Sequence, residues 1–218
     1  MLLDGNLLFD QTPSAYRYAQ ADALTPTNAL YGPAGADIVS STGTPTVGDL
    51  YAFPFMAGFG GTIDQIGINI TSGASNAASL ARVGLYTSND SFNLAPGSLL
   101  LDSGISTITT GAKMALISPT ITLEPGKVYW LAVIYGTTAP TVTTFSSGWH
   151  LFGRNNNFNA QFGWQKVGQG FGALPITFPI SPQPGVCTST PTLVVVRFAT
   201  YKRIIGQSVG YMTALGAE

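Results

Sequence analysis

The sequence predicts an all-β protein, a jelly-roll-like antiparallel β-sandwich with an extended N-terminal arm. Short segments rich in β-branched and aromatic residues recur from residue 49 onward, and turn signals containing glycine or proline separate them. No window of helical length repeats its apolar residues with the period of about 3.6 that marks an amphipathic helix. A length of 218 residues suits one large sandwich. Many short strands between such turns are typical of a sandwich or barrel.

Strands are expected where apolar residues alternate or run together. Pro54 places the aromatic segment 49–56 at a sheet edge or bulge, because proline cannot donate a ladder hydrogen bond. Residues 128–135 are apolar throughout, as a central strand would be. Residues 98–102 and 113–123 are expected to give two or three short strands. The full set of expected strands is 49–56, 63–70, 80–87, 98–102, 113–123, 128–135 and 192–199.

The expected domain organisation is an arm over residues 1–48, a sandwich over 49–200 and a C-terminal tail over 201–218. Proline, glycine, threonine and asparagine dominate the arm, which disfavours helix and strand there. The arm nevertheless carries apolar side chains that need burial, so we expect it to reach onto a neighbouring subunit or an underlying particle. Its expected assembly residues are Leu7, Phe9, Tyr16, Tyr18 and Tyr31.

The charge content limits the classes of partner. Charged residues make up 9% of the chain, against roughly 25% in an ordinary globular domain. The formal net charge is −1, and a neutral polar surface is poor at keeping proteins apart, so we expect the protein to sit against neighbours. Nucleic acid and anionic membranes are disfavoured as partners. The nine Lys and Arg residues are scattered, and only Lys202 and Arg203 are adjacent.

Cysteine use and the N-terminus suit folding in a reducing cytoplasm. Cys187 is the single cysteine, and we expect it to be buried or half-buried without a redox role. No signal peptide is expected, because a basic n-region is missing and Asp4 interrupts the first apolar run. No stretch reaches the roughly 18 apolar residues of a spanning helix.

Three segments between residues 50 and 135 carry a family resemblance. They are 81–86 (ARVGLY), 96–104 (PGSLLLDSG) and 123–132 (LEPGKVYWLA). In order and spacing they resemble a β-sandwich module that recurs in phage tail and virion proteins. The resemblance implies a phage virion structural protein of the tail-fibre or head-decoration type. It implies no enzymatic activity.

Each of these segments also has a structural meaning. Gly84 is expected where another backbone or a bulky ring approaches the strand. The Pro-Gly pairs at 96–97 and 125–126 are expected to form tight turns. Tyr129 and Trp130 are expected to supply alternating large groups to the sandwich core.

No residue pattern predicts catalysis. His150 is the only histidine and would have to carry any Ser-His-Asp triad. No nucleophile elbow, P-loop or dinucleotide fingerprint is present. Nothing marks two of the ten carboxylates as a glycosidase pair. We expect no enzyme and no cofactor, and a hydrolase is a remote alternative.

The metal-ligating residues are equally sparse. One cysteine and one histidine cannot supply the ligands of a structural zinc site. Asn89, Asp90, Ser91 and Asn93 could offer oxygen ligands to calcium, but an Asx-turn loop has the same composition. We favour the loop and expect no metal.

Segment 149–172 combines aromatic rings with amide side chains, which is the composition of a glycan site. It is expected to form a hairpin of 149–153 with 160–167. The alternative is that some rings point into the core and the rest meet a neighbouring subunit, since interfaces are also rich in aromatic residues. We favour the alternative. The candidate glycan or partner contacts are Trp149, Phe152, Arg154, Asn156, Phe158 and Trp164.

Three hypotheses of function follow. The leading one is a non-enzymatic structural component of a bacteriophage virion, made in the host cytoplasm and acting through assembly with itself and with other virion proteins. A homo-oligomer is expected, and analogy with fibres and decoration proteins favours a trimer. The second is a receptor-binding module that recognises host glycan through 149–172. The third is the hydrolase.

Overall fold

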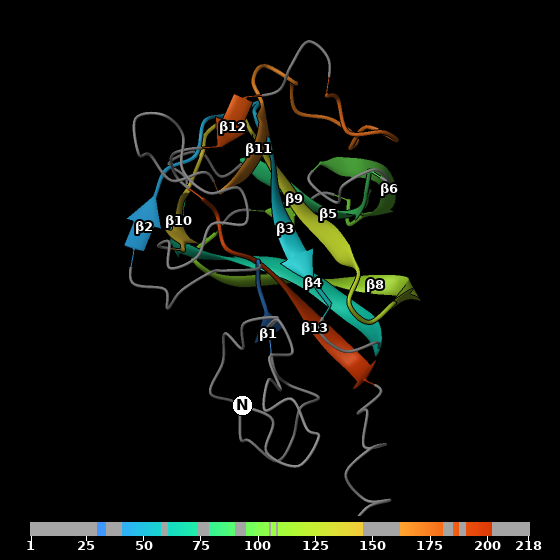
Figure 1. Ribbon diagram of the computed structural model, residues 1–218. Helices are drawn as coiled ribbons and strands as arrows, with labels where there is room; N and C mark the ends of the chain where they lie inside the picture. Colours follow the sequence, from blue (N-terminus) through green and yellow to red (C-terminus); the bar gives the residue numbers. More distant parts are fainter. Residues whose placement is uncertain are drawn as a thin grey trace, which may run out of the picture.

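Figure 1 shows the computed structural model, in which the described residues form strands and loops and no helix. Residues 1–29, 146–161 and the predicted tail from 202 onward lie outside the described residues. The described residues are 30–33, 41–57, 61–73, 79–89, 95–104, 106–107, 109–145, 162–180, 185–187 and 191–201.

The strands form two layers, sheet I and sheet II. In sheet I the pairing order is β1 (Leu30–Tyr31), β13 (Val194–Tyr201), β4 (Gly61–Ser72), β10 (Thr141–Thr144) and β2 (Ser41–Gly43), and β8 (Gly111–Leu123) also pairs with β4. In sheet II the order is β12 (Gly185–Cys187), β11 (Gly163–Lys166), β3 (Leu50–Met56), β9 (Val128–Gly136), β5 (Leu80–Ser88) and β6 (Pro96–Asp102), and β7 (Ser106–Thr107) also pairs with β5. All these pairings are antiparallel, so the predicted jelly-roll-like antiparallel sandwich is confirmed.

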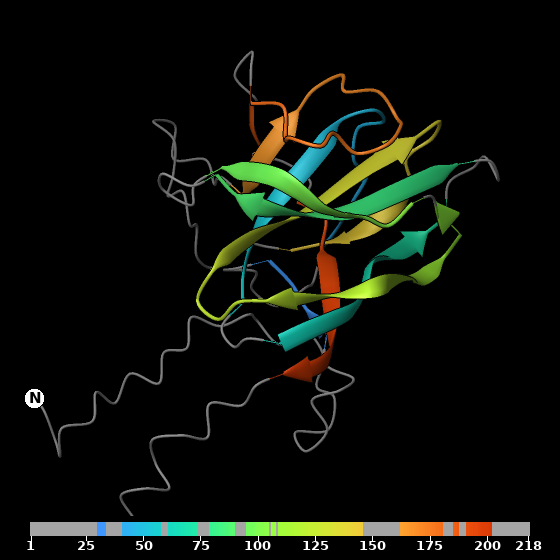
Figure 2. The same ribbon diagram turned by 90° about the vertical axis from the view of Figure 1, so that its right-hand side faces the viewer.

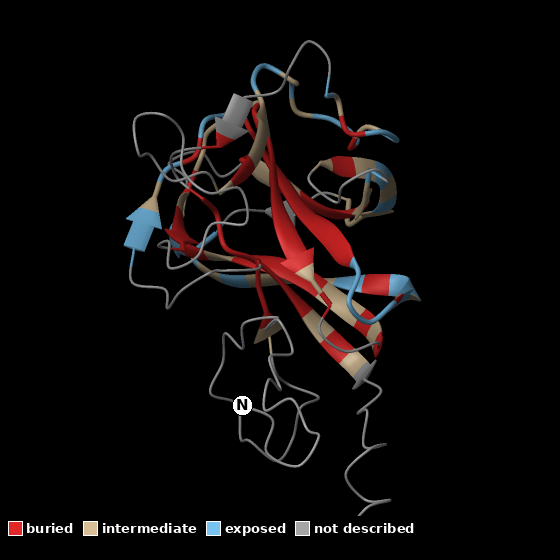
Figure 3. Ribbon diagram, viewed as in Figure 1, coloured by how far each residue is buried: buried red, intermediate tan, exposed pale blue. Residues whose placement is uncertain are grey.

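The core has two parts, on the two sides of sheet II. Strand β9 lies between β3 and β5 and is buried at every position, which confirms it as a central strand. Its alternate side chains point in opposite directions, as the pleat requires. Figure 3 shows this burial as the red strands in the middle of the molecule. The side chains that face sheet I are Tyr129, Leu131, Val133 and Tyr135, and those on the outer face are Val128, Trp130, Ala132 and Ile134.

The sequence patterns predicted the main strands well. The structure has strands at 50–56, 61–72, 80–88, 96–102, 128–136 and 194–201. Pro54 pairs with Trp130 of β9, while β11 pairs with only the first residues of β3 and stops at Ala52. The second half of β3 is therefore an edge among the described residues, as Pro54 predicted.

One local prediction is wrong. Pro96-Gly97 does not form a turn but begins strand β6, and a side chain at Gly97 would lie 3.0 Å from the carbonyl oxygen of Ser88. The glycine is needed there because β6 approaches β5 closely, not because the chain reverses. The prediction that 98–102 and 113–123 give two or three strands is confirmed, since these residues lie in β6 and β8, although β8 is longer than expected. The predicted turn at 125–126 is confirmed, with Gly126 at a φ of 74°.

The predicted hairpin of 149–153 with 160–167 needs correction. Strand β11 pairs through Trp164 with Ala52 of β3 on one edge and with Val186 of β12 on the other. A strand has two edges, so residues 163–166 have no edge left for 149–153. Residues 149–153 themselves lie outside the described residues.

Two pieces of the predicted arm 1–48 belong to the sandwich. Tyr31 in β1 is 4% exposed, and its ring meets the ring of Phe198 edge-on at 5.2 Å between centroids. Strand β2 pairs with β10. Tyr31 was expected to be an assembly residue, but its side chain is buried against Phe198 of the same chain.

Alkaline pH is expected to destabilise the fold. Burial raises the pKa of the phenols of Tyr51, Tyr86 and Tyr135 above the ordinary value of 10.0. Above about pH 10 the unfolded chain loses these protons while the folded chain keeps them, so stability falls as pH rises. Denaturant unfolding measured between pH 8 and 11 should show a falling midpoint, and a Tyr86→Phe variant should show a shallower fall. A midpoint that stays constant would contradict the prediction.

Candidate interaction surface

A segment that we call the strap, residues 167–180, covers the outer face of sheet II. It leaves β11 and returns through 181–184 to β12, although these two strands are paired neighbours, with Gly163 opposite Cys187. The strap is therefore part of a long connection between two adjacent strands. Figure 2 shows it in orange on the side of sheet II that faces away from sheet I. Its buried side chains Leu174 and Phe178 complete the outer part of the core.

The first anchor of the strap is the carboxylate of Asp49, which is 4% exposed. One oxygen accepts a hydrogen bond of 2.8 Å from the backbone N–H of Gly168, and the other accepts one of 2.8 Å from Nε2 of Gln165. The N–H of Gly170 donates to the carbonyl oxygen of Gly48 at 3.0 Å. A buried carboxylate needs such donors, so Asp49 fixes the start of the strap to the start of β3.

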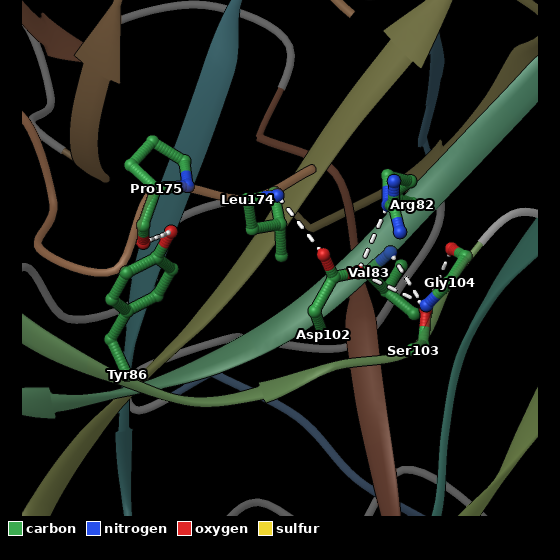
Figure 4. Close-up of polar contacts among 8 residues, drawn as sticks. All are labelled: Arg82, Val83, Tyr86, Asp102, Ser103, Gly104, Leu174 and Pro175. Atoms are coloured by element: carbon green, nitrogen blue, oxygen red, sulfur yellow. Dashed lines mark hydrogen bonds and ion pairs between the residues drawn. The ribbon is translucent and has the colours of Figure 1, made fainter. Parts of the chain in front are cut away.

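The second anchor is Asp102, at the end of β6 (Figure 4). Oδ1 accepts from Nε of Arg82 at 2.9 Å and from the N–H of Gly104 at 3.0 Å, while Oδ2 accepts from the N–H of Leu174 at 3.0 Å. Nearby, the hydroxyl of Tyr86 donates to the carbonyl oxygen of Pro175 at 2.9 Å. Asp102 thus joins the middle of the strap to β5 and β6.

Two glycines of sheet II make room for strap side chains. A side chain at Gly136 would lie 2.6 Å from the ring of Phe171, and one at Gly84 would lie 2.2 Å from Cδ1 of Leu174. Such separations are shorter than any real van der Waals contact. Gly84 was predicted to mark a close approach, and the structure confirms this: the approaching groups are Leu174 and the backbone of Leu101.

The far end of the strap pairs with β6. The N–H of Leu99 donates to the carbonyl oxygen of Ile176 at 2.8 Å, and the N–H of Phe178 donates to that of Gly97 at 2.9 Å. The ring of Phe178 packs edge-on against Tyr86, with centroids 5.6 Å apart. The strap therefore covers the edge of sheet II at β6, which would otherwise be open to further strand pairing.

The outward side of the strap is apolar and carries no charge. Residues 167–180 include no Asp, Glu, Lys or Arg. Five of the six most exposed large apolar side chains in the described residues lie on the strap or next to its anchors, and the sixth is Leu116 on β8. The five are Val47 (41% exposed), Leu100 (41%), Val167 (66%), Ile176 (83%) and Ile180 (41%).

Most of the residues singled out as contacts in the sequence lie outside the described residues. Trp164 is described, on β11, where it is half-buried and packs against the outer part of the core. The undescribed ones are Trp149, Phe152, Arg154, Asn156 and Phe158 of the glycan set, Leu7, Phe9, Tyr16 and Tyr18 of the arm, His150, and Asp90, Ser91 and Asn93 of the calcium run. Their roles stay predictions. Cys187 is buried, as predicted.

The four described carboxylates all have structural partners. Asp49 and Asp102 hold the strap, Asp64 pairs with Arg197, and Glu124 pairs with Lys127 at 2.8 Å. The described part of the chain contains no group of three His, Cys, Asp or Glu residues that could hold a metal ion. No helix capable of spanning a membrane is found there.

Comparisons with known proteins give little further information. No protein-family model matches the sequence, and no curated protein matches it either. A protein in the solved structure of infectious bursal disease virus, Gx strain, is 10% identical, with a TM-score of 0.24, over 90% of this chain and 53% of that one. The chain therefore spans about half the length of that protein. A TM-score this low establishes neither a common fold nor a common role.

Proposed function

We propose that the chain is a non-enzymatic structural component of a bacteriophage virion, a decoration, capsid-associated or tail-fibre protein that acts by assembling with itself and with other virion proteins. The observation that carries the proposal is the strap surface. It is largely apolar and uncharged, yet it is anchored at its start by the buried carboxylate of Asp49 and at its middle by the half-buried carboxylate of Asp102. Interface cores in proteins have this composition, because charged residues are depleted there.

Two further observations support the proposal. The segments 81–86, 96–104 and 123–132 resemble the phage sandwich module, and all three have structural roles in sheet II or at its border. The four described carboxylates serve in anchors and ion pairs, which is a structural use.

The test is quantitative mass spectrometry of particles purified from the source phage. Recovery in many copies, comparable with the capsid protein, would identify a capsid or decoration component. Recovery in a few copies per particle would identify a tail or fibre protein. A non-structural phage protein, monitored in the same sample, measures carry-over from the lysate. If this chain is no more abundant than that control, the proposal is wrong.

A further inference from the structure

Strand β8 is the long border strand of sheet I. It spans 13 residues and pairs with β4 along one side, and no described residue pairs with its other side. Figure 1 shows β8 at this border, beside β4. The other border strands are short or covered: β1 has two residues, β2 and β12 have three each, and the strap lies along β6. The free side of a border strand presents N–H and C=O groups to which a strand of another chain can add.

Lys113 places a charge on the inner side of this border. It lies opposite Ile68 of β4, which is in the core, and directly opposed residues share a face of the sheet. The side chain of Lys113 therefore starts on the face that points toward sheet II. It is half-buried, and no ion pair joins it to another described residue. Its ammonium group must reach water past the free side of β8, because β4 and the core lie on the other side.

A strand added to β8 would close this path to water. The added strand would continue sheet I beyond Lys113, and the ammonium group would be enclosed between the layers. Enclosing an unpaired charge is strongly unfavourable. A second copy of β8 could not supply a partner, because β8 contains no Asp or Glu.

The middle of β8 resists strand addition for a different reason. Between Leu116, opposite Gln65, and Ile121, opposite Ile63, four residues of β8 face a single residue of β4. Such a bulge bends the strand and interrupts its ladder. Pro119 lies within the bulge and has no N–H to donate. An added strand could therefore pair continuously only with 111–116, which includes Lys113, or with the short end of β8 beyond the bulge.

We infer that Lys113, together with the bulge at Pro119, prevents β8 from pairing with β8 of another copy of this chain. The protection has to be local, because charged residues make up 9% of the chain and its net charge of −1 keeps copies apart only weakly. The inference goes beyond the proposed function and does not depend on it. It states where copies do not join: contacts between them use surfaces other than the free side of β8.

The experiment compares three variants of the full chain, Lys113→Val, Lys113→Arg and Lys127→Val. The first removes the charge from β8 and the second keeps it. The third removes the same charge from an exposed turn, where Lys127 pairs with Glu124. Light scattering over a range of protein concentrations gives the concentration at which association begins. Lys113→Val is expected to lower that concentration at least about tenfold, and the other two variants should leave it within about twofold of the unmodified chain.

Hydrogen exchange locates the contact in the associated Lys113→Val protein. The backbone amides of 112–116 should exchange more slowly than in the unmodified chain, because those on the free side of β8 gain partners. Unfolding curves check that the variant is folded, which is expected because valine favours strands and Lys113 is not fully buried. If Lys113→Val does not fold, Lys113→Thr, which is also uncharged and suits a strand, provides the same test.

Three results would overturn the inference. The uncharged variant at position 113 could associate at no lower concentration than Lys127→Val, it could associate while the amides of 112–116 exchange as before, or Lys113→Arg could associate as readily as Lys113→Val. None of these results bears on the virion role, which the abundance of the chain in particles tests separately.

Discussion

Asp102→Ala is expected to lower the free energy of unfolding by about 3 kcal/mol and to release the strap from sheet II. The carboxylate accepts hydrogen bonds from the backbone N–H groups of Gly104 and Leu174 and from Arg82. Removing it leaves a guanidinium and two amides without their acceptor, and each lost bond to a charged group costs about 1.5–3 kcal/mol, partly recovered by water. Denaturant unfolding would measure the loss of stability. Faster hydrogen exchange at the Leu174 amide would show that the strap has been released from sheet II.

The matched control for Asp102 is Asp64→Ala in sheet I. Asp64 also pairs with an arginine, Arg197, but it holds no segment of chain. The side chains of this ion pair are 28% and 21% exposed, so Asp64→Ala is expected to cost about 1–2 kcal/mol, less than Asp102→Ala because only the arginine loses its acceptor. Equal losses in the two variants, or an Asp102→Ala protein whose Leu174 amide exchanges as slowly as before, would show that the carboxylate does not anchor the strap.

Gly84→Ala is expected to lower the free energy of unfolding by about 2 kcal/mol, although it adds a single methyl group. That group would lie 2.2 Å from Cδ1 of Leu174 and 2.6 Å from the carbonyl oxygen of Leu101, so the strap and β6 must both move. Overpacking of this kind typically costs about 1–3 kcal/mol. Thermal or denaturant unfolding measures the effect.

Gly172→Ala is the matched control within the strap. Nothing lies within 4 Å of the added methyl group there, so the variant should match the parent or exceed it by about 0.5 kcal/mol. Adding Leu174→Ala to Gly84→Ala removes the side-chain clash but not the clash with the Leu101 backbone. Leu174→Ala alone costs stability because Leu174 is buried, so the test is whether Gly84→Ala costs less in the Leu174→Ala background than in the parent, though not nothing. A Gly84→Ala protein as stable as Gly172→Ala would mean that the strap does not press on β5.

The strands could be predicted because they depend on local patterns. The apolar run at 128–135 required burial on both faces, and β9 has it. Alternation at Ile66, Ile68 and Ile70 predicted the buried face of β4, where all three side chains are in the core. Trp130 and Tyr129 lie on opposite sides of sheet II, as the period of a strand demands.

The strap could not be predicted, because nothing local determines its place. Its anchors join residues far apart in the sequence, with Asp49 bonding Gly168 and Asp102 bonding Leu174. The segment has no strand or helix period, and its glycines and prolines predict only a loop. The same holds for Tyr31, because an aromatic residue within a proline-rich stretch gives no sign that its partner is Phe198. The one feature of the sequence that sets residues 167–180 apart is that they include no charged residue.

Strand β13 has a further consequence for how the protein is made. It lies between β1 and β4, so the last described strand fills an interior position of sheet I. At a synthesis rate of about 5–20 residues per second, it leaves the ribosome several seconds after β4. During that delay β4 lacks its neighbour β13, so the apolar side chains that β13 later covers stay uncovered. Pairings between distant parts of a chain also form slowly. Nascent chains should therefore depend on chaperones, and a ribosome that stops before residue 194 should release an aggregation-prone product.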